Sequence, residues 1–381
     1  MAPIRVGIIG LGAQSGAFGP GFWGVQAHLP HLQASPAYEI VALCNSSAES
    51  ARKSIEFHKL PATTAAYGNA EDLAKDPNVD LVVVSVQVQK HFQLAKPAIQ
   101  HGKDVFVEWP LGASIQESEE LTRLAKEAGV KTMVGVQARA SRLVVAVKRL
   151  LAEGKIGKVI SSHVLGNACL LPVDVWWEGT EYYQDMKSGG NEFYIHFGHF
   201  LDSFVDALGD FDTLQSTLST QWPTIALLNA TGEVVNPAYP RTSPDHILVQ
   251  GKLESGAVAS ISFRHTKSAV DKTCIKWIIA GTDGEIEVTL AERLGAMESQ
   301  WQVASPSFKL TVRVGREEVG EFDLSSVSDD LVAEGLDVVA LNTGLLYEAF
   351  AKGDESRYAS FETALKTHQL LERIVKAAGW D

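Results

Sequence analysis

Residues 80–86, DLVVVSV, limit the possible folds more than any other stretch of this sequence. Their apolar run is continuous, whereas a strand with one face in water alternates apolar and polar side chains. A strand that is buried on both faces is typical of a parallel sheet that carries helices on each side. The sequence therefore predicts an α/β layer around these residues.

Similar apolar runs alternate with amphipathic segments over the first part of the chain. We expect strands at residues 4–9, 38–44, 80–86, 104–108 and 131–137, and helices at residues 23–35, 49–58, 69–75, 91–101 and 115–129. Repeated strand–helix–strand units build a doubly wound Rossmann sheet, because parallel neighbours need crossover connections. Residues 1–138 are thus predicted to form a nucleotide-binding domain.

The pattern changes after residue 139, where strands outnumber helices. Two hairpins are expected, residues 246–253 with 257–264 and residues 274–280 with 285–290, each joined by a turn that contains glycine. Further strands are expected at residues 161–167, 213–221 and 301–315, and helices at residues 143–153, 192–208, 338–351 and 360–378. Consecutive hairpins imply a large mixed or antiparallel sheet, so residues 139–381 are predicted to form an α+β domain. Its last helices are free to pack back on the first domain.

The chain has 381 residues and a formal net charge of −13, with 45% apolar and 21% charged residues. Its length fits two globular domains, and its acidity argues against a nucleic-acid surface, which needs clustered Lys and Arg. No stretch approaches the length of a membrane span, and the N-terminus does not resemble a signal peptide. Three scattered cysteines show neither a disulfide nor a metal-binding pattern. We expect a cytosolic protein without a metal site.

A glycine-rich loop follows the first strand directly, with Gly10, Gly12 and the small residue Ser15 in the spacing of a dinucleotide fingerprint. The first glycine permits a tight turn, and the second lets the backbone approach a pyrophosphate at a helix N-terminus. The pattern is a weak signal by itself, and a glycine loop without such a role is the alternative. Its place directly after the first strand favours a dinucleotide site.

The tip of the second strand reads Asn45-Ser46-Ser47. NAD-preferring sites carry an acid here, which holds the ribose 2′-hydroxyl. This tip has no carboxylate to repel a 2′-phosphate, it offers small hydrogen-bond donors, and Arg52 follows on the next helix. NADP(H) is therefore the favoured cofactor, and NAD(H) is the alternative.

Two neighbouring strands end in polar or aromatic residues. Gln87 and His91 follow residues 80–86, and Glu108-Trp109-Pro110 ends the strand at residues 104–108, because proline cannot extend a ladder. Ligands of open parallel sheets sit beyond the carboxyl ends of the strands, so these residues are candidates for an active-site rim. The alternative for Glu108-Trp109-Pro110 is a strand edge that a tryptophan plugs.

Residues 174–202 hold a second concentration of aromatic and polar side chains. On the helix expected at residues 192–208, His199 lies on one face and His196 points elsewhere. Hydride transfer needs a proton donor or acceptor near the reacting carbon, and histidine or tyrosine can serve near neutral pH. His199 and Tyr183 are therefore catalytic candidates, although a histidine on a helix is more often structural.

Motifs along nearly the whole chain resemble one family: GIIGLG, VEWPLG, the segment that begins at Gln137, FGHFLD and SFETALKTHQLLERIV. The sequence resembles the glucose-fructose oxidoreductase, inositol dehydrogenase and rhizopine-catabolism (GFO/IDH/MocA) family and, more narrowly, its fungal galactose-repressor-like branch. This resemblance and the patterns above together indicate the candidate cofactor contacts, which are Gly10, Gly12, Ser15, Asn45, Ser46, Ser47, Arg52, Gln87, His91, Glu108, Trp109 and Gln137. The resemblance also implies a homodimer built through the sheet of the second domain.

Two positions depart from the family pattern. The family strand end reads Glu-Lys-Pro with a catalytic lysine, and this chain has Trp109 in the lysine position. The family aspartate four residues before the active-site histidine is replaced by Ile195, which leaves His199 alone of the usual three groups. An ammonium can move a proton and polarise a carbonyl, whereas an indole only donates one hydrogen bond and stacks. Trp109 is therefore expected to shape the substrate site.

Two functions from different classes fit these observations. The first is an NADP(H)-dependent oxidoreductase that acts on a hydroxyl, carbonyl or conjugated double bond of a small molecule. The second is a catalytically silent dinucleotide-binding protein that regulates a partner. An aromatic-lined pocket and a retained histidine favour the enzyme. A redox protein whose substrate is a protein-bound intermediate is a third alternative.

Overall fold

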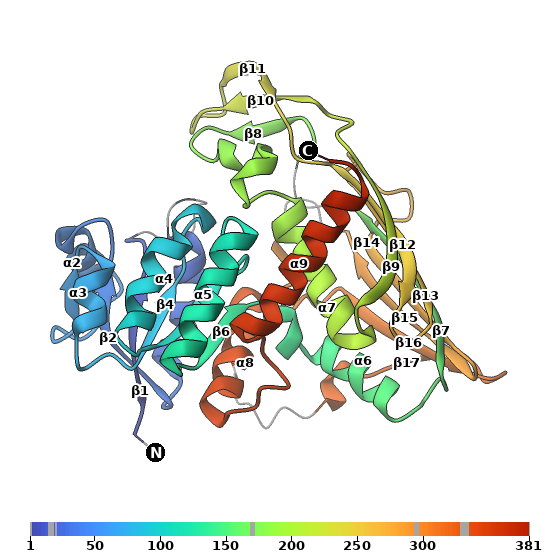
Figure 1. The fold of residues 1–381 in the computed structure, drawn as a ribbon, viewed down its shortest axis with the longest axis horizontal. Helices are drawn as coiled ribbons and strands as arrows, with labels where there is room; N and C mark the ends of the chain where they lie inside the picture. Colours follow the sequence, from blue (N-terminus) through green and yellow to red (C-terminus); the bar gives the residue numbers. More distant parts are fainter. Residues whose placement is uncertain are drawn as a thin grey trace. The chain divides into compact units, whose positions relative to one another are not determined.

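The computed structural model describes residues 2–13, 19, 21–167, 172–292, 297–327 and 335–380 (Figure 1). The chain divides into two compact units. The first unit holds Met1–Ala140 and Asp330–His368, and the second holds Ser141–Asp329 and Gln369–Asp381. Each unit is therefore assembled from two separate pieces of the chain. No helix in the described ranges is long and apolar enough to cross a membrane.

The first unit is built on a sheet of six parallel strands. They are β1 (Ile4–Ile9), β2 (Tyr38–Cys44), β3 (Ala65–Tyr67), β4 (Leu81–Val84), β5 (Asp104–Glu108) and β6 (Thr132–Gly135). Their order is β3-β2-β1-β4-β5-β6, so the chain moves outward in both directions from the adjacent β1 and β4. Ligands of such sheets bind beyond the carboxyl ends of the strands at this reversal point. The predicted Rossmann-type sheet is confirmed.

Helices connect these strands. They are α1 (Leu29–Ala34), which follows the π-helical segment η1 (Gly24–His28), and α2 (Ala48–Phe57), α3 (Ala70–Lys75), α4 (His91–Gln100) and α5 (Ile115–Ala128). The side chains of Ser47, Asn69 and Ser114 accept hydrogen bonds from backbone N–H groups in the first turns of α2, α3 and α5. These caps explain why the three helices start where they do.

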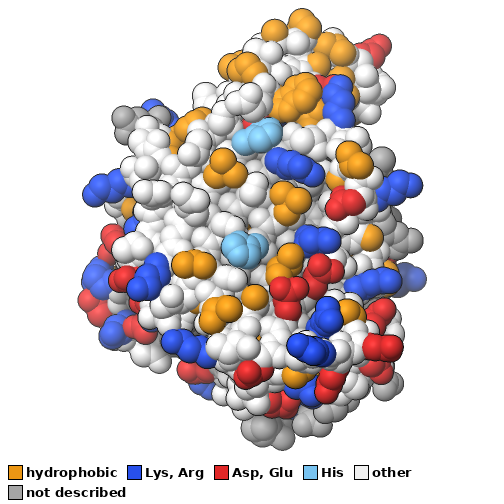
Figure 2. All heavy atoms as spheres, turned by 90° about the vertical axis from the view of Figure 1, so that its right-hand side faces the viewer, with side chains coloured by type: hydrophobic (Ala, Val, Ile, Leu, Met, Phe, Trp, Pro, Cys, Tyr) orange, Lys and Arg blue, Asp and Glu red, His pale blue; other side chains and the backbone are white. Residues whose placement is uncertain are grey.

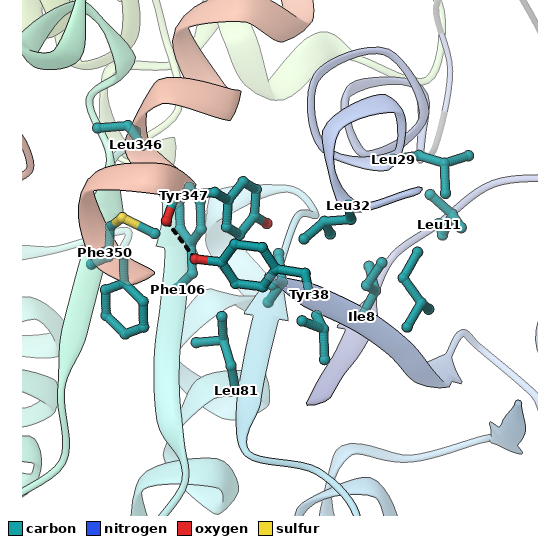
Figure 3. Packing of buried hydrophobic residues seen from close by; sticks show 14 of the residues in the cluster. Ile8, Leu11, Leu29, Leu32, Tyr38, Leu81, Phe106, Leu346, Tyr347 and Phe350 are labelled. Atoms are coloured by element: carbon teal, nitrogen blue, oxygen red, sulfur yellow. Dashed lines mark hydrogen bonds between the residues drawn. The ribbon is translucent and has the colours of Figure 1, made fainter. Parts of the chain in front are cut away.

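The core of the first unit includes a helix from far along the chain, α8 (Val338–Lys352). Figure 3 shows Tyr347 of α8 beside Phe106 of β5 and Tyr38 of β2. Tyr347 is fully buried, and the Tyr38 hydroxyl donates to its carbonyl oxygen. Burial of one large apolar side chain contributes about 1.5–3 kcal/mol. The Rossmann core is therefore completed by residues that lie about 200 positions after its last strand in the sequence.

The second unit contains an eight-stranded sheet with the order β17-β16-β15-β14-β7-β13-β12-β9. Its strands are β7 (Val159–Asn167), β9 (Phe211–Ser219), β12 (His246–Leu253), β13 (Val258–Arg264), β14 (Thr273–Gly281), β15 (Gly284–Ala291), β16 (Phe308–Val314) and β17 (Gly320–Glu321). Both predicted hairpins are present, β12 with β13 and β14 with β15. Between them β7 runs parallel to β13 and antiparallel to β14, so the predicted mixed sheet is confirmed.

Helices cover one face of this sheet, and aromatic side chains fill the space between. They are α6 (Arg142–Ala152), α7 (Gly198–Leu208) and the end of α9 (Phe361–Ala377) (Figure 1). Phe200 and Phe204 of α7 lie with their ring centroids 5.7 and 5.8 Å from that of Trp277 on β14. Trp301 packs on Phe200 at 5.0 Å. The strand predicted at residues 301–315 is shorter, because Trp301 is used as a core side chain and β16 begins only at Phe308.

Two features of the second unit differ from the prediction. A small sheet, ordered β11-β10-β8, is formed by β8 (Val175–Trp177), β10 (Thr224–Leu228) and β11 (Val234–Pro240). Three residues are too few to show a period, and two prolines interrupt the β11 pattern. The helix predicted at residues 192–208 is divided, because the π-helical segment η6 (Phe193–Phe197) precedes α7.

Candidate functional site

Glycines shape the loop that follows β1. Gly10 has a φ of 100°, and a Cβ at this position would lie 2.4 Å from the carbonyl oxygen of Ser85, just after β4. Gly21 has a φ of 80°, and its Cβ would lie 2.2 Å from the backbone nitrogen of Gly12. Only glycine combines these conformations with so close a backbone approach. Gly21, which lies directly before the first helical residues, thus packs against the loop at Gly12.

The third fingerprint position was predicted at Ser15, which lies outside the described residues. Among the described residues, Gly21 and Gly24 make the close approaches to the loop, and a Cβ on Gly24 would lie 3.1 Å from the carbonyl oxygen of Gly10. Sequence reasoning missed both residues because the glycines lie beyond the standard spacing. The signal was the second group of glycines in residues 19–24, GPGFWG.

Three side chains hold the carbonyl groups of this loop. Asn45 Nδ2 and Ser54 Oγ donate to the carbonyl oxygen of Leu11 at 2.9 and 2.8 Å. His58 Nε2 lies 2.6 Å from the carbonyl oxygen of Gly12 and donates to it, because a carbonyl only accepts. We call Asn45, Ser54 and His58 the loop clamp.

The loop clamp engages carbonyl oxygens of the loop and none of its backbone N–H groups. Within the described ranges, no residue accepts a hydrogen bond from the N–H of Leu11 or Gly12. Adjacent N–H groups in a loop that leads into a helix form a site for an anion such as a pyrophosphate. The loop therefore has features that suit a dinucleotide, and the individual contacts expected from the sequence stay predictions.

The tip of β2 offers fewer open groups than its sequence suggests. The Asn45 amide nitrogen points toward the glycine loop. Besides the Leu11 carbonyl, it donates to Ser54 Oγ at 3.0 Å. Ser47 accepts from the N–H of Ser50 at 3.1 Å and caps α2. Ser46 and Arg52 are exposed. These last two side chains remain the open donors beside the tip.

His91 joins the ends of two neighbouring strands. Its Nδ1 lies 2.8 Å from the carbonyl oxygen of Pro110, and its Nε2 lies 2.9 Å from that of Val86. Burial lowers the pKa of His91 more than the contacts with the Val86 and Pro110 carbonyl groups raise it. Gln87 is half-buried at the same strand end. His91 thus supports the backbone beyond β4 and β5.

Glu108 lies in a buried row of polar groups. Its Oε1 is 2.9 Å from His28 Nε2, and Gln137 Nε2 donates to its Oε1 and Oε2 at 3.1 and 2.9 Å. His28 Nδ1 lies 2.8 Å from the Tyr347 hydroxyl. A Cβ on Gly135 would lie 2.5 Å from the Glu108 carboxylate, so the acid is closely packed. Glu108 and Gln137 therefore hold the ends of β5, β6 and η1 together.

Trp109 follows Glu108 through a backbone that turns sharply at a cis peptide bond to Pro110. Its side chain is 5% exposed, and its ring meets that of His368 edge-on with centroids 6.4 Å apart. Burial lowers the pKa of His368 to about 4, so this neighbour is neutral at pH 7. The position that carries lysine in the family pattern is therefore a buried, uncharged aromatic pair in this chain.

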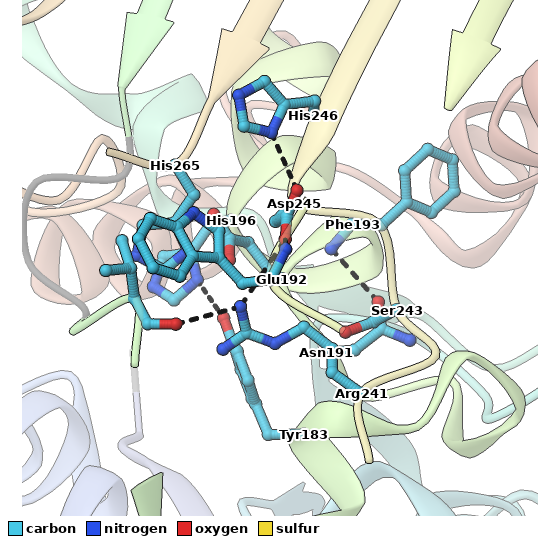
Figure 4. A network of polar contacts seen from close by, with 12 residues as sticks. Tyr183, Asn191, Glu192, Phe193, His196, Arg241, Ser243, Asp245, His246 and His265 are labelled. Atoms are coloured by element: carbon cyan, nitrogen blue, oxygen red, sulfur yellow. Dashed lines mark hydrogen bonds and ion pairs between the residues drawn. The ribbon is translucent and has the colours of Figure 1, made fainter. Parts of the chain in front are cut away.

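A second group of polar side chains is buried in the second unit (Figure 4). The Tyr183 hydroxyl is hydrogen-bonded to His196 Nδ1, and His265 Nδ1 lies 2.9 Å from Glu192 Oε2. Burial raises the pKa of Tyr183 well above its ordinary value and lowers that of His196 to about 4. Burial by itself would raise the pKa of Glu192, but its interactions with His265 and, more weakly, with His196 and Arg241 together outweigh it and hold the pKa low. The cluster therefore holds an anionic carboxylate beside neutral His196.

His199 lies three residues after His196, in the first turn of α7. It is buried, and its Nδ1 has no hydrogen-bond partner among the described residues. Burial, with a smaller contribution from His196, lowers the pKa of His199 to about 3. His196, which was predicted to point away from the His199 face, bonds Tyr183, the other catalytic candidate of the second unit.

Other ionisable groups of this region are engaged. Tyr194 donates to Glu372 Oε1 at 2.9 Å, and Arg241 Nε donates to Gln184 Oε1 at 2.7 Å. In the described part of the chain, no three His, Cys, Asp or Glu side chains meet as metal ligands would. The buried histidine and tyrosine side chains of this unit are therefore candidates for proton transfer to or from an organic substrate.

Both units match known families. Residues 4–136 match the family described as "Oxidoreductase family, NAD-binding Rossmann fold". Residues 143–289 match the family described as "Gal80p, C-terminal domain". The two matches meet near the boundary between the two structural units.

Relatives of this chain include an enzyme and regulators. The chain is 28% identical over 378 residues to the dehydrogenase aclE of Aspergillus oryzae, which covers 98% of this chain and 96% of that protein. It is 30% identical over 297 residues to the galactose/lactose metabolism regulatory protein GAL80 of Saccharomyces cerevisiae, with 75% and 67% covered. The solved structure of the transcriptional regulator Gal80p from Kluyveromyces lactis is 26% identical with a TM-score of 0.82, covering 99% of this chain and 92% of that one. The first unit is an NAD-binding Rossmann domain, and the chain belongs to the GFO/IDH/MocA oxidoreductase family, in its Gal80-like branch.

Proposed function

We propose that this protein is an NADP(H)-dependent oxidoreductase that acts on a hydroxyl, carbonyl or conjugated double bond of a small molecule. The observation that carries the proposal is the buried Nδ1 of His199, which lacks a partner in the described chain. An unpaired buried polar atom costs about 1–3 kcal/mol, and a ligand that supplied a partner for it would remove this cost. A substrate oxygen is such a partner, and a silent regulator has no evident need for one.

The first unit fits a nicotinamide dinucleotide. The N–H groups of Leu11 and Gly12 suit a pyrophosphate, and the loop clamp holds their carbonyl groups away. NADP(H) is favoured because the β2 tip has no carboxylate and because Ser46 and Arg52 are exposed beside it. The bound cofactor supplies hydride transfer.

Proton transfer falls to the second unit in this proposal. Trp109 replaces the family lysine and lies beside a neutral His368, so that position provides no ammonium. His199 and Tyr183 are the acid–base candidates that remain, and both are held by packed elements of the second unit. Trp109 shapes a flat, apolar boundary of the substrate site.

Regulation of a partner is the second candidate function, and the likeness to GAL80 favours it. In that case the dinucleotide binds as an effector and no substrate is turned over. The two functions differ in one measurable property, because only the enzyme consumes cofactor in proportion to product.

The test follows NADPH absorbance while the purified full chain is mixed with a panel of carbonyl and enone compounds. We expect loss of one NADPH per product formed, and a His199→Ala variant that turns over about 10²–10⁴-fold more slowly with unchanged cofactor binding. His101→Ala, at an exposed histidine paired with Glu71, is the matched control and should behave as the wild type.

The outcomes separate the two functions. Thermal stabilisation by NADPH without turnover of any compound would establish the regulator instead. Equal stabilisation by NADPH and NADH would contradict the preference argued from the β2 tip.

We also propose a homodimer formed through the outer face of the eight-stranded sheet. Leu165, Leu248 and Val258 are 41%, 49% and 54% exposed on its central strands. Figure 2 shows hydrophobic side chains spread among polar ones on this side. The register places Leu248, Ser262 and Leu165 in one row across β12, β13 and β7. A flat face with small and apolar side chains suits contact with a second copy.

A further inference from the structure

Arg264, the last residue of β13, has no partner for its charge in the described part of the chain. Its side chain is half-buried, and its guanidinium makes no hydrogen bond or ion pair with a described residue. Among the guanidinium nitrogens only Nε is buried without a partner, so solvent reaches the two Nη atoms. A charge that is partly removed from water costs free energy unless a partner replaces its hydration. An anion at the Nη atoms would supply that partner.

The carboxylates nearest to Arg264 are engaged by other groups. His246 pairs with Arg264 in the register of β12 and β13, and its Nδ1 lies 2.7 Å from Asp245 Oδ1 (Figure 4). Asp245 also accepts hydrogen bonds from two backbone N–H groups at 2.8 Å. His265, which follows Arg264, lies 2.9 Å from Glu192 Oε2. Both flanking histidines thus have an acid, whereas the arginine between them does not.

Arg264 and Asn167 lie side by side on the outer face of the eight-stranded sheet. The Phe263 ring packs on Phe197 and Phe200, with centroids 5.3 and 5.2 Å apart, and so belongs to the face that the helices cover. Because successive side chains of a strand alternate, Arg264 leaves the sheet on the opposite face. Asn167 on β7 is its register partner, and its side chain therefore leaves on the same face.

The Asn167 amide is fixed at its oxygen and has an unused nitrogen. Its Oδ1 accepts from the N–H and the hydroxyl of Thr266 at 3.2 and 3.3 Å. The residue is 4% exposed, and its Nδ2 lacks a hydrogen-bond partner among the described residues. This nitrogen only donates, as the guanidinium does. The second unpartnered group therefore indicates the same class of ligand, one that carries acceptor oxygens.

The surrounding face does not cancel the positive charge. The row across β12, β13 and β7 that contains Arg264 consists of His246, Arg264 and Asn167, without a carboxylate. The next row on this face, Leu248, Ser262 and Leu165, is uncharged. Figure 2 shows a histidine beside a Lys or Arg side chain in the upper part of this face. Such a local positive potential attracts anions.

We propose that Arg264 and Asn167 bind a small oxyanion, which is a carboxylate or a phosphate group, on the outer face of the second unit. A guanidinium presents N–H donors in one plane that match the paired oxygens of either group. The Asn167 amide adds a further donor. The site is distinct from the glycine loop of the first unit, and it does not depend on the oxidoreductase function.

The experiment measures thermal unfolding of the full chain in sodium phosphate or sodium malonate. Sodium chloride keeps the ionic strength constant, so that general screening is the same in every sample. Saturating NADPH is present throughout to occupy the glycine loop, which also suits phosphate. We expect a saturable rise in the Tm of the wild type with at least one of the two anions, and the stronger response identifies the ligand group.

Three variants locate the binding site. Arg264→Gln removes the charge but keeps a planar amide, and it should weaken anion binding about ten- to a hundredfold. Lys276→Gln is the matched control, because Lys276 lies on the same face but has Glu287 as a partner at 3.6 Å, and it should change the affinity less than about twofold. Asn167→Asp keeps the acceptor for Thr266 and places a carboxylate beside Arg264. This variant should unfold at no lower temperature than the wild type, yet lose its response to added anions.

Two outcomes would overturn the site. The first is a wild type that responds to neither anion, and the second is an equal response in the wild type and Arg264→Gln. Light scattering tests the other source of a carboxylate. If Arg264→Gln converted a dimer to a monomer and neither anion stabilised the wild type, the partner of Arg264 would be an acid of a second copy, and the site for a free anion would be wrong. Failure of the NADPH turnover assay would leave the site unaffected.

Discussion

The loop clamp leads to a prediction about cofactor binding that does not depend on catalysis. Ser54 is fully buried on α2, donates to the Leu11 carbonyl at 2.8 Å and accepts from Asn45 at 3.0 Å. Ser54→Ala removes both bonds, and also a longer contact to the Ser50 carbonyl at 3.2 Å, while alanine preserves the helix. At about 0.5–1.5 kcal/mol for each bond, the free energy of unfolding should fall by about 1–3 kcal/mol.

The effect on binding follows from the orientation of the loop. In the variant only Asn45 Nδ2 still donates to the Leu11 carbonyl, so the peptide that carries the Gly12 N–H is held less firmly in its orientation. A hydrogen bond to a charged group contributes about 1.5–3 kcal/mol, so loss of one should weaken NADPH binding by about ten- to a hundredfold. Adenosine, which has no phosphate, should not depend on this bond.

Calorimetric titration of the full chain with NADPH, ADP and adenosine measures the difference. We expect weaker binding of the first two ligands and unchanged binding of adenosine. Ser50→Ala, one turn earlier on the same helix, is the control, because the Ser50 side chain makes no bond to the loop. Equal losses for all three ligands, or none for NADPH despite a lower stability, would refute the reasoning.

Two further predictions concern acid stability and assembly. Burial lowers the pKa values of His196 and His368 to about 4, so the unfolded chain binds more protons between about pH 6.5 and 4. The free energy of unfolding should therefore fall as the pH drops through this window. Urea unfolding at pH 7 and pH 5 measures this fall, and the His368→Phe variant should show a smaller one. The same fall in the variant and the wild type would contradict the prediction. Val258→Glu should convert the proposed dimer to a monomer in gel filtration with light scattering. Val270→Glu, at a fully exposed residue outside the sheet, is the control and should leave the dimer intact. A wild-type monomer would contradict this assembly.

Much of the fold could be predicted because its signals are local. Continuous apolar residues at 81–84 require burial on both faces, and the glycine turn at 254–256 requires a hairpin. The π-helical turn at η6 could not be predicted, because residues 193–208 show the same apolar pattern on both sides of the change of helix type. The short β8 is likewise stabilised by its pairing with β10.

The candidate site could be located from the sequence more readily than its contacts could be assigned. Asn45 stands at the strand tip where a ribose contact is expected, but its amide donates to the Leu11 carbonyl and to Ser54 Oγ. Glu108 stands at the expected rim, but its carboxylate bonds His28 and Gln137. A position in a motif gives the neighbourhood of a side chain, whereas its direction depends on partners such as Ser54 and His28, which are distant in the sequence.

The place of α8 in the Rossmann core has a consequence for synthesis of the protein on the ribosome. The six-stranded sheet is complete once β6 has emerged, but Tyr347, with its bonds to Tyr38 and His28, arrives about 200 residues later. At about 5–20 residues per second, that interval lasts on the order of 10–40 seconds. During it the apolar surface around Phe106 has no cover from α8. The nucleotide-binding unit, although first to be translated, is thus among the last parts to close, and a chaperone that shields this surface would act in that interval.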